Sequence, residues 1–184
     1  RLGESGETDM VVAGGVESMT RAPWVLPKPS RSFPAGDVTA VSTTLGWRLV
    51  NPRMPVGWVV SLGECNEQLA ETTGISRERQ DEYAVGSHER AARAWAEGFY
   101  DDLVVPVPGV VLERDESLRP GTTVEALARL KPSFRPGGTI TAGNASPLSD
   151  GASAVLLGSA EAAANLGLDP VARVAGRGTA AVEP

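Results

Sequence analysis

The chain has 184 residues, enough for one ordinary hydrophobic core or for a small domain and part of another. Its formal net charge of -6 at pH 7 argues against a nucleic-acid partner, because binding to phosphates needs a basic surface. Hydrophobic residues make up 41% of the sequence, yet no apolar run reaches the roughly 20 residues that a membrane-spanning helix needs. We therefore expect a folded protein with neither a nucleic-acid nor a membrane partner.

The chain contains one cysteine, Cys65, and therefore cannot form an internal disulfide. This composition suits a reducing compartment, and we predict a cytoplasmic location. Residues 1–8 are polar, unlike a secretory signal, and the first methionine is Met10. We expect the numbering to begin inside a longer reading frame.

The first half of the chain predicts a strand, a long irregular stretch and then two helices. Residues 9–13 are typical of a short buried strand closed by two glycines, and residues 21–60 show no sustained period. Helices are expected over residues 61–73, ended by Gly74, and from Ser76 to Glu97, with Ser76 as the N-cap and Gly98 as the stop. Their buried faces should be apolar or small: Leu62, Cys65, Leu69 and Ala70 in the first, and Tyr83, Ala84, Ser87, Ala91, Ala94 and Trp95 in the second.

The rest of the chain alternates short strands and helices in its pattern. The predicted strands cover residues 103–107, 110–112 and 171–176, and the predicted helices cover residues 123–129 and 159–166. Between them, residues 139–157 combine a loop of Gly, Asn, Ser and Pro with an apolar strand. Small residues let a ligand approach the backbone, and Asn144 and Ser146 add short hydrogen-bonding groups, so this segment is the best candidate for a binding surface.

Two reactive residue types occur singly, and both favour a structural interpretation. Cys65 lies on a predicted apolar helix face close to Glu64 and Glu67, and neighbouring carboxylates disfavour a thiolate. His88 is expected in mid-helix at a solvated position. The sequence has no cluster with the spacing of a metal site, and we expect no metal. Gly14 and Gly15 lack the pattern of a phosphate-binding loop.

Three separated motifs resemble the thiolase family, in the family's order: residues 11–20, residues 62–82 and residues 139–157. The resemblance covers nearly the whole chain and matches the central segment of an acetyl-CoA acetyltransferase or 3-ketoacyl-CoA thiolase. It implies an α/β, thiolase-like layered fold, present in part, with an inserted mixed α+β loop domain. The implied domains are residues 1–19 (N-terminal domain core), 20–139 (loop domain on the CoA-binding side), 140–168 (return to that core) and 169–184 (start of the C-terminal domain).

The resemblance also implies a function. Thiolases transfer acyl groups between 3-ketoacyl-CoA or acetyl-CoA and coenzyme A through a cysteine thioester. None of the family's catalytic groups maps onto this chain, so we expect the nucleophile elsewhere, no catalytic residue here, and no activity from this segment alone. Coenzyme A is the implied substrate, homodimers or homotetramers are the implied assemblies, and fatty acid or lipid metabolism is the implied context. Glu17 and Met19 would lie near the active-site region.

The family pattern assigns a set of substrate positions. Arg119, Arg129, Lys131 and Arg135 form a loose basic series in an otherwise acidic chain, and its alternative interpretation is a solvated basic face. Arg119 falls where the family packs a side chain against the nucleotide of coenzyme A. Leu62 replaces a methionine that follows a histidine in many acetoacetyl-specific members, and Asn66 replaces an alanine, which favours longer or bulkier acyl groups. The implied set is Arg119 for the nucleotide, Ala126 and Leu127 for the pantetheine arm, Ala142, Ser146 and Leu148 for the thioester end, and Leu62 for the acyl group.

Two other functions are compatible with these residues. One is a catalytically inactive module of thiolase fold that binds coenzyme A or serves assembly. The other is an unrelated nucleotide-binding α/β domain, which the lack of a phosphate loop disfavours.

Overall fold

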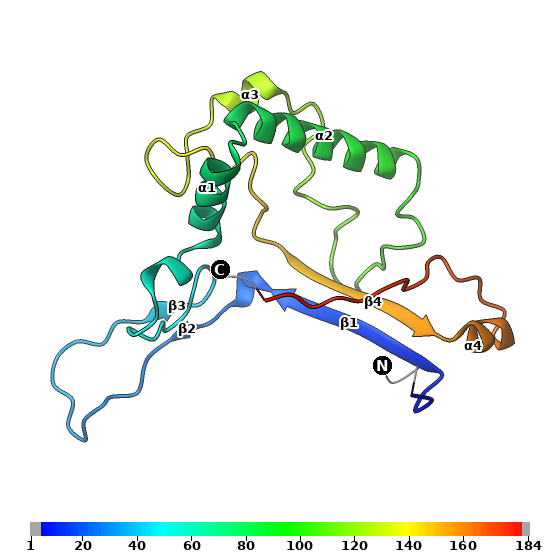
Figure 1. Cartoon of the computed structure of the whole chain (residues 1–184), viewed down its shortest axis with the longest axis horizontal. Helices are drawn as coiled ribbons and strands as arrows, with labels where there is room; N and C mark the ends of the chain where they lie inside the picture. Colours follow the sequence, from blue (N-terminus) through cyan, green and yellow to red (C-terminus); the bar gives the residue numbers. More distant parts are fainter. Residues whose placement is uncertain (1–4, 182–184) are drawn as a thin grey trace. The chain divides into compact units, whose positions relative to one another are not determined.

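The computed structural model describes residues 5–181. The chain forms two compact units (Figure 1). One comprises residues up to Thr44 together with residues from Leu148 onward, and the other is Leu45–Pro147. The mixture of helices and strands agrees with the predicted α/β class. The domain limits expected at residues 20 and 139 stay predictions.

The first unit is built on one long antiparallel strand pair. Strand β1 (Met10–Ser18) pairs with β4 (Asp150–Gly158) from Met10 opposite Gly158 to Ser18 opposite Asp150. The expectation that two glycines close the first strand is wrong, because β1 continues through them. A Cβ atom at Gly14 would lie 2.6 Å from the carbonyl oxygen of Ser153, so glycine permits the close pairing at this point.

Smaller elements complete this unit. Strand β2 (Trp24–Val25) pairs antiparallel with β3 (Val41–Ser42), 3₁₀ helix η1 is Met19–Arg21, and α4 is Ala160–Asn165. Just beyond β1, Thr20 donates from its backbone nitrogen and its hydroxyl to the two carboxylate oxygens of Asp150, at 3.0 and 2.5 Å. The strand predicted over residues 171–176 is irregular, since no neighbouring strand among the described residues takes up its backbone hydrogen bonds.

The second unit is helical. It contains 3₁₀ helix η2 (Val56–Trp58) and helices α1 (Leu62–Thr73), α2 (Arg77–Ala96) and α3 (Val124–Ala128), with α3 beside the N-terminal part of α2 (Figure 1). The predicted Ser76 cap and Gly74 stop are confirmed, because the Ser76 side chain accepts from a backbone N–H group and Gly74 ends α1 with φ of 68°. The side chain of Ser61 caps α1 in the same way, which was not predicted. The strands predicted over residues 103–107 and 110–112 are wrong: the stretch is exposed and irregular.

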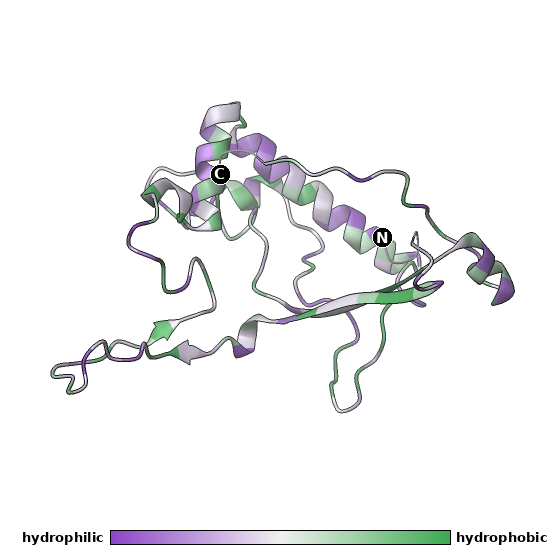
Figure 2. Ribbon diagram, turned by 60° about the horizontal axis from the view of Figure 1, so that its bottom comes forward, coloured by the Kyte–Doolittle hydropathy of each residue, from purple (hydrophilic) through white to green (hydrophobic). Residues whose placement is uncertain are grey.

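The buried faces of α1 and α2 are not the apolar faces that were expected. Leu62 is 82% exposed, Leu69 is 54% exposed and Cys65 is exposed as well. The prediction of Cys65 as a buried hydrophobe is therefore wrong, since α1 turns Gly63 and Glu67 inward instead. On α2, where hydrophilic and hydrophobic residues both occur along the helix (Figure 2), the predicted stripe is only partly right.

On α2, Asp81 is the buried residue, while Tyr83 and Ser87 of the predicted stripe are exposed. Ala84, Ala91, Ala94 and Trp95 are half-buried. The buried sides of α1 and α2 thus each centre on a carboxylate. Among residues 5–181, no helix combines the length and apolar character that crossing a membrane demands.

Replacing Gly63 by Ala should lower the free energy of unfolding by about 1–3 kcal/mol, because the added methyl group would overlap the ring of Phe134. Thermal unfolding of the whole protein measures the change. Gly86→Ala in α2 is the matched control, since its methyl would meet only the flexible end of Arg90, at 3.1 Å. The control should be neutral or stabilising by up to about 1 kcal/mol. An unchanged Gly63→Ala midpoint would contradict this packing.

Candidate functional site

The carboxylate of Glu67, on α1, is the centre of the second unit. It is 1% exposed and accepts backbone hydrogen bonds from Thr139, at 2.8 and 2.9 Å, and from Ile140, at 2.8 Å. The hydroxyl of Thr139 donates to it at 2.9 Å. A buried carboxylate with this many donors ties the start of the 139–145 loop to the side of α1.

The surroundings of Glu67 favour its charged form. Burial alone would raise the pKa of Glu67, but the backbone hydrogen bonds from Ile140 and Thr139, the Thr139 hydroxyl and the charge of Arg135 together lower it below its ordinary value. Arg135 itself pairs with Glu64 at 3.3 Å and Glu71 at 2.5 Å. Glu67 therefore acts as an ionised structural acceptor.

A second cluster of charged side chains, the ion pair of Arg77 and Asp81, lies on α2. The Nε of Arg77 donates to Asp81 at 2.7 Å, and its Nη2 donates to the carbonyl oxygens of Leu127, at 2.6 Å, and Leu130, at 3.3 Å. Asp81 is 1% exposed and accepts a further hydrogen bond from the amide of Asn144 at 3.0 Å. Helix α2, the end of α3 and the 139–145 loop meet at these two side chains.

The 139–145 loop is also folded on itself. The backbone nitrogen of Thr141 donates to the side-chain oxygen of Asn144 at 2.7 Å, and the Asn144 amide donates to the carbonyl of Thr139 at 3.1 Å. Thr141 is completely buried, and its hydroxyl accepts from the backbone nitrogen of Gly143 at 3.1 Å. The result is a well-anchored loop of small residues, on which Ala142 is exposed.

The structure brings part of the predicted substrate set together. Leu127 on α3 is buried and packs against Gly143 of the loop, and Ala126, Ala142 and Ser146 are exposed beside these elements. Leu62 is exposed at the start of α1. Leu148 belongs to the other unit, where it is 53% exposed.

The backbone of Arg119 is anchored while the residue stays exposed. Its nitrogen donates to the Nδ1 of His88 at 3.4 Å, and its carbonyl accepts from the hydroxyl of Thr122 at 2.7 Å. His88, expected at a solvated position without a partner, is half-buried and holds this turn. Of the other basic residues, Arg129 and Lys131 are exposed, whereas Arg135 is engaged in its ion pairs.

Three residues of this site were not predicted from the sequence: Glu67, Arg77 and Asp81. A charged residue on a helix is assigned to water by default. One signal was available, since Arg77 and Asp81 stand four residues apart, at the spacing of a helical ion pair. Nothing local marks Glu67, whose partners lie 72 and 73 positions further along.

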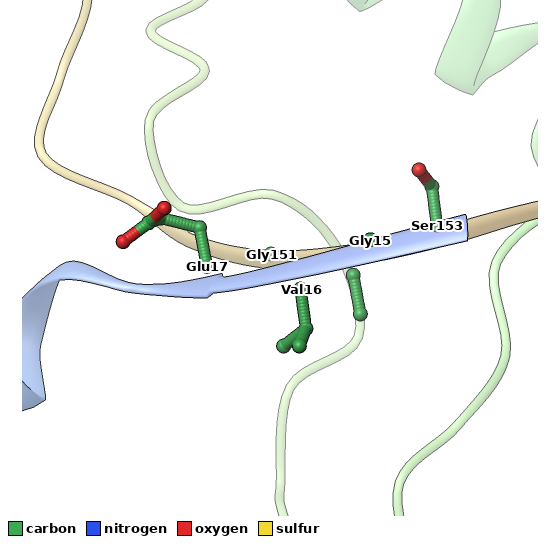
Figure 3. A pocket seen from close by; sticks show the side chains of 6 residues that line it. Gly15, Val16, Glu17, Gly151 and Ser153 are labelled. Carbon is green, nitrogen blue, oxygen red and sulfur yellow. The ribbon is translucent and has the colours of Figure 1, made fainter.

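The first unit has an open hollow of about 510 Å³ along its strand pair, lined by Gly15, Val16, Glu17, Gly151, Ala152 and Ser153. Figure 3 shows the side chains of Glu17 and Ser153 on one face of the pair and that of Val16 on the other. Glu17 is exposed and Met19 is half-buried. Within the described residues, no three His, Cys, Asp or Glu side chains are grouped to hold a metal ion.

Comparison with known proteins identifies relatives for most of the chain. The family described as "Thiolase, N-terminal domain" matches residues 4–161. The beta-ketoadipyl-CoA thiolase of Pseudomonas putida is 44% identical over 98% of this chain and 46% of its own length. The 3-oxoadipyl-CoA/3-oxo-5,6-dehydrosuberyl-CoA thiolase of Escherichia coli strain K12 is 46% identical over 98% of this chain and 47% of its own. The chain spans about half the length of these curated relatives.

Solved structures give the same result for the fold. Human mitochondrial 3-ketoacyl-CoA thiolase in complex with CoA matches with a TM-score of 0.76 at 32% identity, covering 90% of this chain and 42% of that one. The acetyl-CoA acetyltransferase of Syntrophomonas wolfei matches with a TM-score of 0.77 at 33% identity, covering 92% and 42%. The predicted thiolase-like fold, present in part, is confirmed.

Replacing Glu67 by Gln should destabilise the protein by about 1–3 kcal/mol at pH 7, because the amide turns a donor toward backbone donors. Since folding lowers the pKa of Glu67, its contribution is complete above the ordinary glutamate pKa of about 4.3 and is lost as the pH falls through the lower folded value. The difference in unfolding free energy between the two proteins should therefore shrink below about pH 4.3.

Urea unfolding over a pH series measures this difference. Glu82→Gln, at an exposed position of α2, is the control and should change stability by less than about 0.5 kcal/mol. A Glu67→Gln difference that stayed constant down to low pH would show that the carboxylate's charge contributes nothing.

Proposed function

This chain belongs to the thiolase family, and we propose that the whole protein transfers acyl groups between 3-oxoacyl-CoA or acetyl-CoA and coenzyme A through a cysteine thioester. The thioester-forming cysteine is proposed to lie outside these 184 residues. Cys65 is two residues from the inward-facing Glu67 and is exposed, so it lies on the other side of α1 from the anchored loop.

The proposed coenzyme A site uses the loop and helix α3. Ala126 and Leu127 are proposed beside the pantetheine arm, and Ala142 and Ser146 at the thioester end. Leu148, expected with them from the sequence, belongs to the other unit and stays a prediction. The observation that carries this is the 139–145 loop, whose small residues allow a close approach while Glu67 and Asn144 hold its backbone in place. The human mitochondrial 3-ketoacyl-CoA thiolase, a solved relative, is in complex with CoA, which supports the ligand class.

Arg119 is proposed to contact the nucleotide of coenzyme A. A guanidinium can stack on adenine and approach phosphates, and this one is exposed while its backbone is fixed by His88 and Thr122. Arg129 and Lys131 would add positive charge for the phosphates in an otherwise acidic chain.

The proposed acyl group is larger than acetoacetyl. Relatives at 44% and 46% identity are named for beta-ketoadipyl-CoA and 3-oxoadipyl-CoA, whose acyl groups end in a free carboxylate. Leu62, which stands 82% exposed at the start of α1, is proposed to contact the acyl chain of the substrate. Homodimeric or homotetrameric assembly, a cytoplasmic location and a role in fatty acid or lipid metabolism stay predictions.

A catalytically inactive module that binds coenzyme A is the second candidate. It shares every residue of the proposed binding site and differs only in turnover, so a single assay separates the two.

The whole protein should cleave 3-oxoadipyl-CoA with free coenzyme A, with a kcat/KM about tenfold or more above that for acetoacetyl-CoA, because a site shaped for a longer acyl group gains its extra contacts in the transition state. Chromatography of the acyl-CoA products measures both rates. A higher kcat/KM with acetoacetyl-CoA would refute the proposal that the substrate has the longer acyl group. Coenzyme A binding without any cleavage would establish the inactive module.

Replacing Arg119 by Ala should raise the KM for coenzyme A about fivefold to thirtyfold with kcat within about twofold, since the lost stacking and charge contacts lie far from the reacting thiol. The backbone atoms of Arg119 make its contacts to His88 and Thr122, so the variant keeps them. Arg79→Ala, at an exposed position of α2, is the matched control. Initial rates at varied coenzyme A concentrations give the KM and kcat of each variant. A KM for Arg119→Ala equal to that of the wild-type protein would exclude Arg119 from the site.

A further inference from the structure

Helix α3 and the 139–145 loop are in direct contact. A Cβ atom at Gly143 would lie 2.5 Å from the Cδ2 of Leu127 and 2.6 Å from the Cδ1 of Leu130. The backbone of the loop thus rests on these two leucines, and any side chain at Gly143 would push the two segments apart. Ala126 on α3 and Ala142 on the loop are exposed on these two segments.

The same two leucines are held from their backbone side by Arg77. Its Nη2 donates to the carbonyl oxygens of Leu127 and Leu130, at 2.6 and 3.3 Å. The Leu127 carbonyl lies in the last turn of α3 and also accepts from the backbone nitrogen of Leu130 at 2.9 Å, and Leu130 follows two residues after the helix. A positive charge at this C-terminal end also interacts favourably with the helix dipole. Arg77 therefore adds a side-chain anchor to the turn that ends α3.

Through Asp81, Arg77 also holds the loop. The Nε of Arg77 donates to one oxygen of Asp81 at 2.7 Å, and the amide of Asn144 donates to the other oxygen at 3.0 Å. Asn144 in turn bonds the backbone of Thr141 and Thr139. One buried carboxylate and one guanidinium, 18% exposed, thus connect the two segments independently of the Gly143 contact.

We propose that Arg77 is a positioning residue that sets the spacing between α3 and the 139–145 loop, and through it the affinity for the pantetheine arm. This inference rests on the proposed coenzyme A site. Arginine is required because its planar fork serves a carboxylate and two carbonyls at once, whereas the single ammonium of lysine cannot span them. Arg77 touches no substrate; it acts through the backbone of Leu127 and Leu130 and through Asn144.

The test is thiolysis by the whole protein with either coenzyme A or pantetheine as the acyl acceptor. Arg77→Lys should raise the KM for both acceptors about fivefold or more, since both contain the pantetheine arm, with kcat changed less than KM. Arg119→Ala should raise the KM for coenzyme A alone, because pantetheine lacks the nucleotide. Arg79→Lys, at an exposed position of α2, is the matched control and should change neither value.

Gly143→Ala is the second variant, and it alters the spacing without touching a charged group. It should reproduce the Arg77→Lys pattern, and it carries the test if Arg77→Lys does not fold. Circular dichroism and thermal unfolding establish that each variant is folded at the assay temperature. A purely structural role for Arg77 would lower the midpoint of unfolding and leave both KM values unchanged.

The outcomes separate this inference from the proposed function. If wild-type protein cleaves the substrate and Arg119→Ala weakens coenzyme A, but the folded Arg77→Lys and Gly143→Ala variants keep both KM values, the positioning role is refuted and the function stands. If wild-type protein neither binds coenzyme A nor cleaves the substrate, the function and the positioning role fall together.

Discussion

The structure of the second unit depends on one carboxylate. Glu67 accepts the backbone hydrogen bonds of Thr139 and Ile140 at the point where the chain returns to α1, and its burial removes the competition of water for those donors. The loop after it has little apolar surface of its own, so packing alone would hold it weakly. A charge inside the unit thus takes the place that a hydrophobic cluster has in most small domains.

The second carboxylate, Asp81, extends this arrangement rather than repeating it. Glu67 anchors the start of the loop, whereas Asp81 reaches its later part through Asn144 and shares a guanidinium with the end of α3. Leu127 and Ile140 are the buried hydrophobic side chains among the described residues. The backbone of Ile140 is bonded to Glu67, and that of Leu127 to Arg77. A site built this way has a fixed backbone and a small-residue surface, which suits a thin, flexible ligand arm.

Local chemistry accounts for what could be predicted before the fold was known. The end of α1 and the start of α2 follow from Gly74 and Ser76, whose capping preferences depend only on their immediate neighbours. The inward face of α1 could not be predicted in this way, because hydrophobicity directs Leu62 inward and Glu67 outward. The reason for the reversal lies in backbone donors far along the chain, and no local pattern encodes them.

The strand predictions over residues 103–107, 110–112 and 171–176 failed for a related reason, since a strand exists only where a neighbour accepts its hydrogen bonds. Residues 150–158 have that neighbour in β1, and there the apolar pattern predicted the strand correctly.

The bond between Glu67 and Thr139 joins positions 72 apart and so closes a large ring of chain. Most of the irregular stretch between α2 and α3 lies inside that ring and away from its anchors. The entropy of ring closure grows only with the logarithm of length, at about 0.6 kcal/mol for each doubling. Insertions and deletions between the end of α2 and the turn at Arg119 should therefore accumulate at low cost over evolution, leaving the anchored loop as it is.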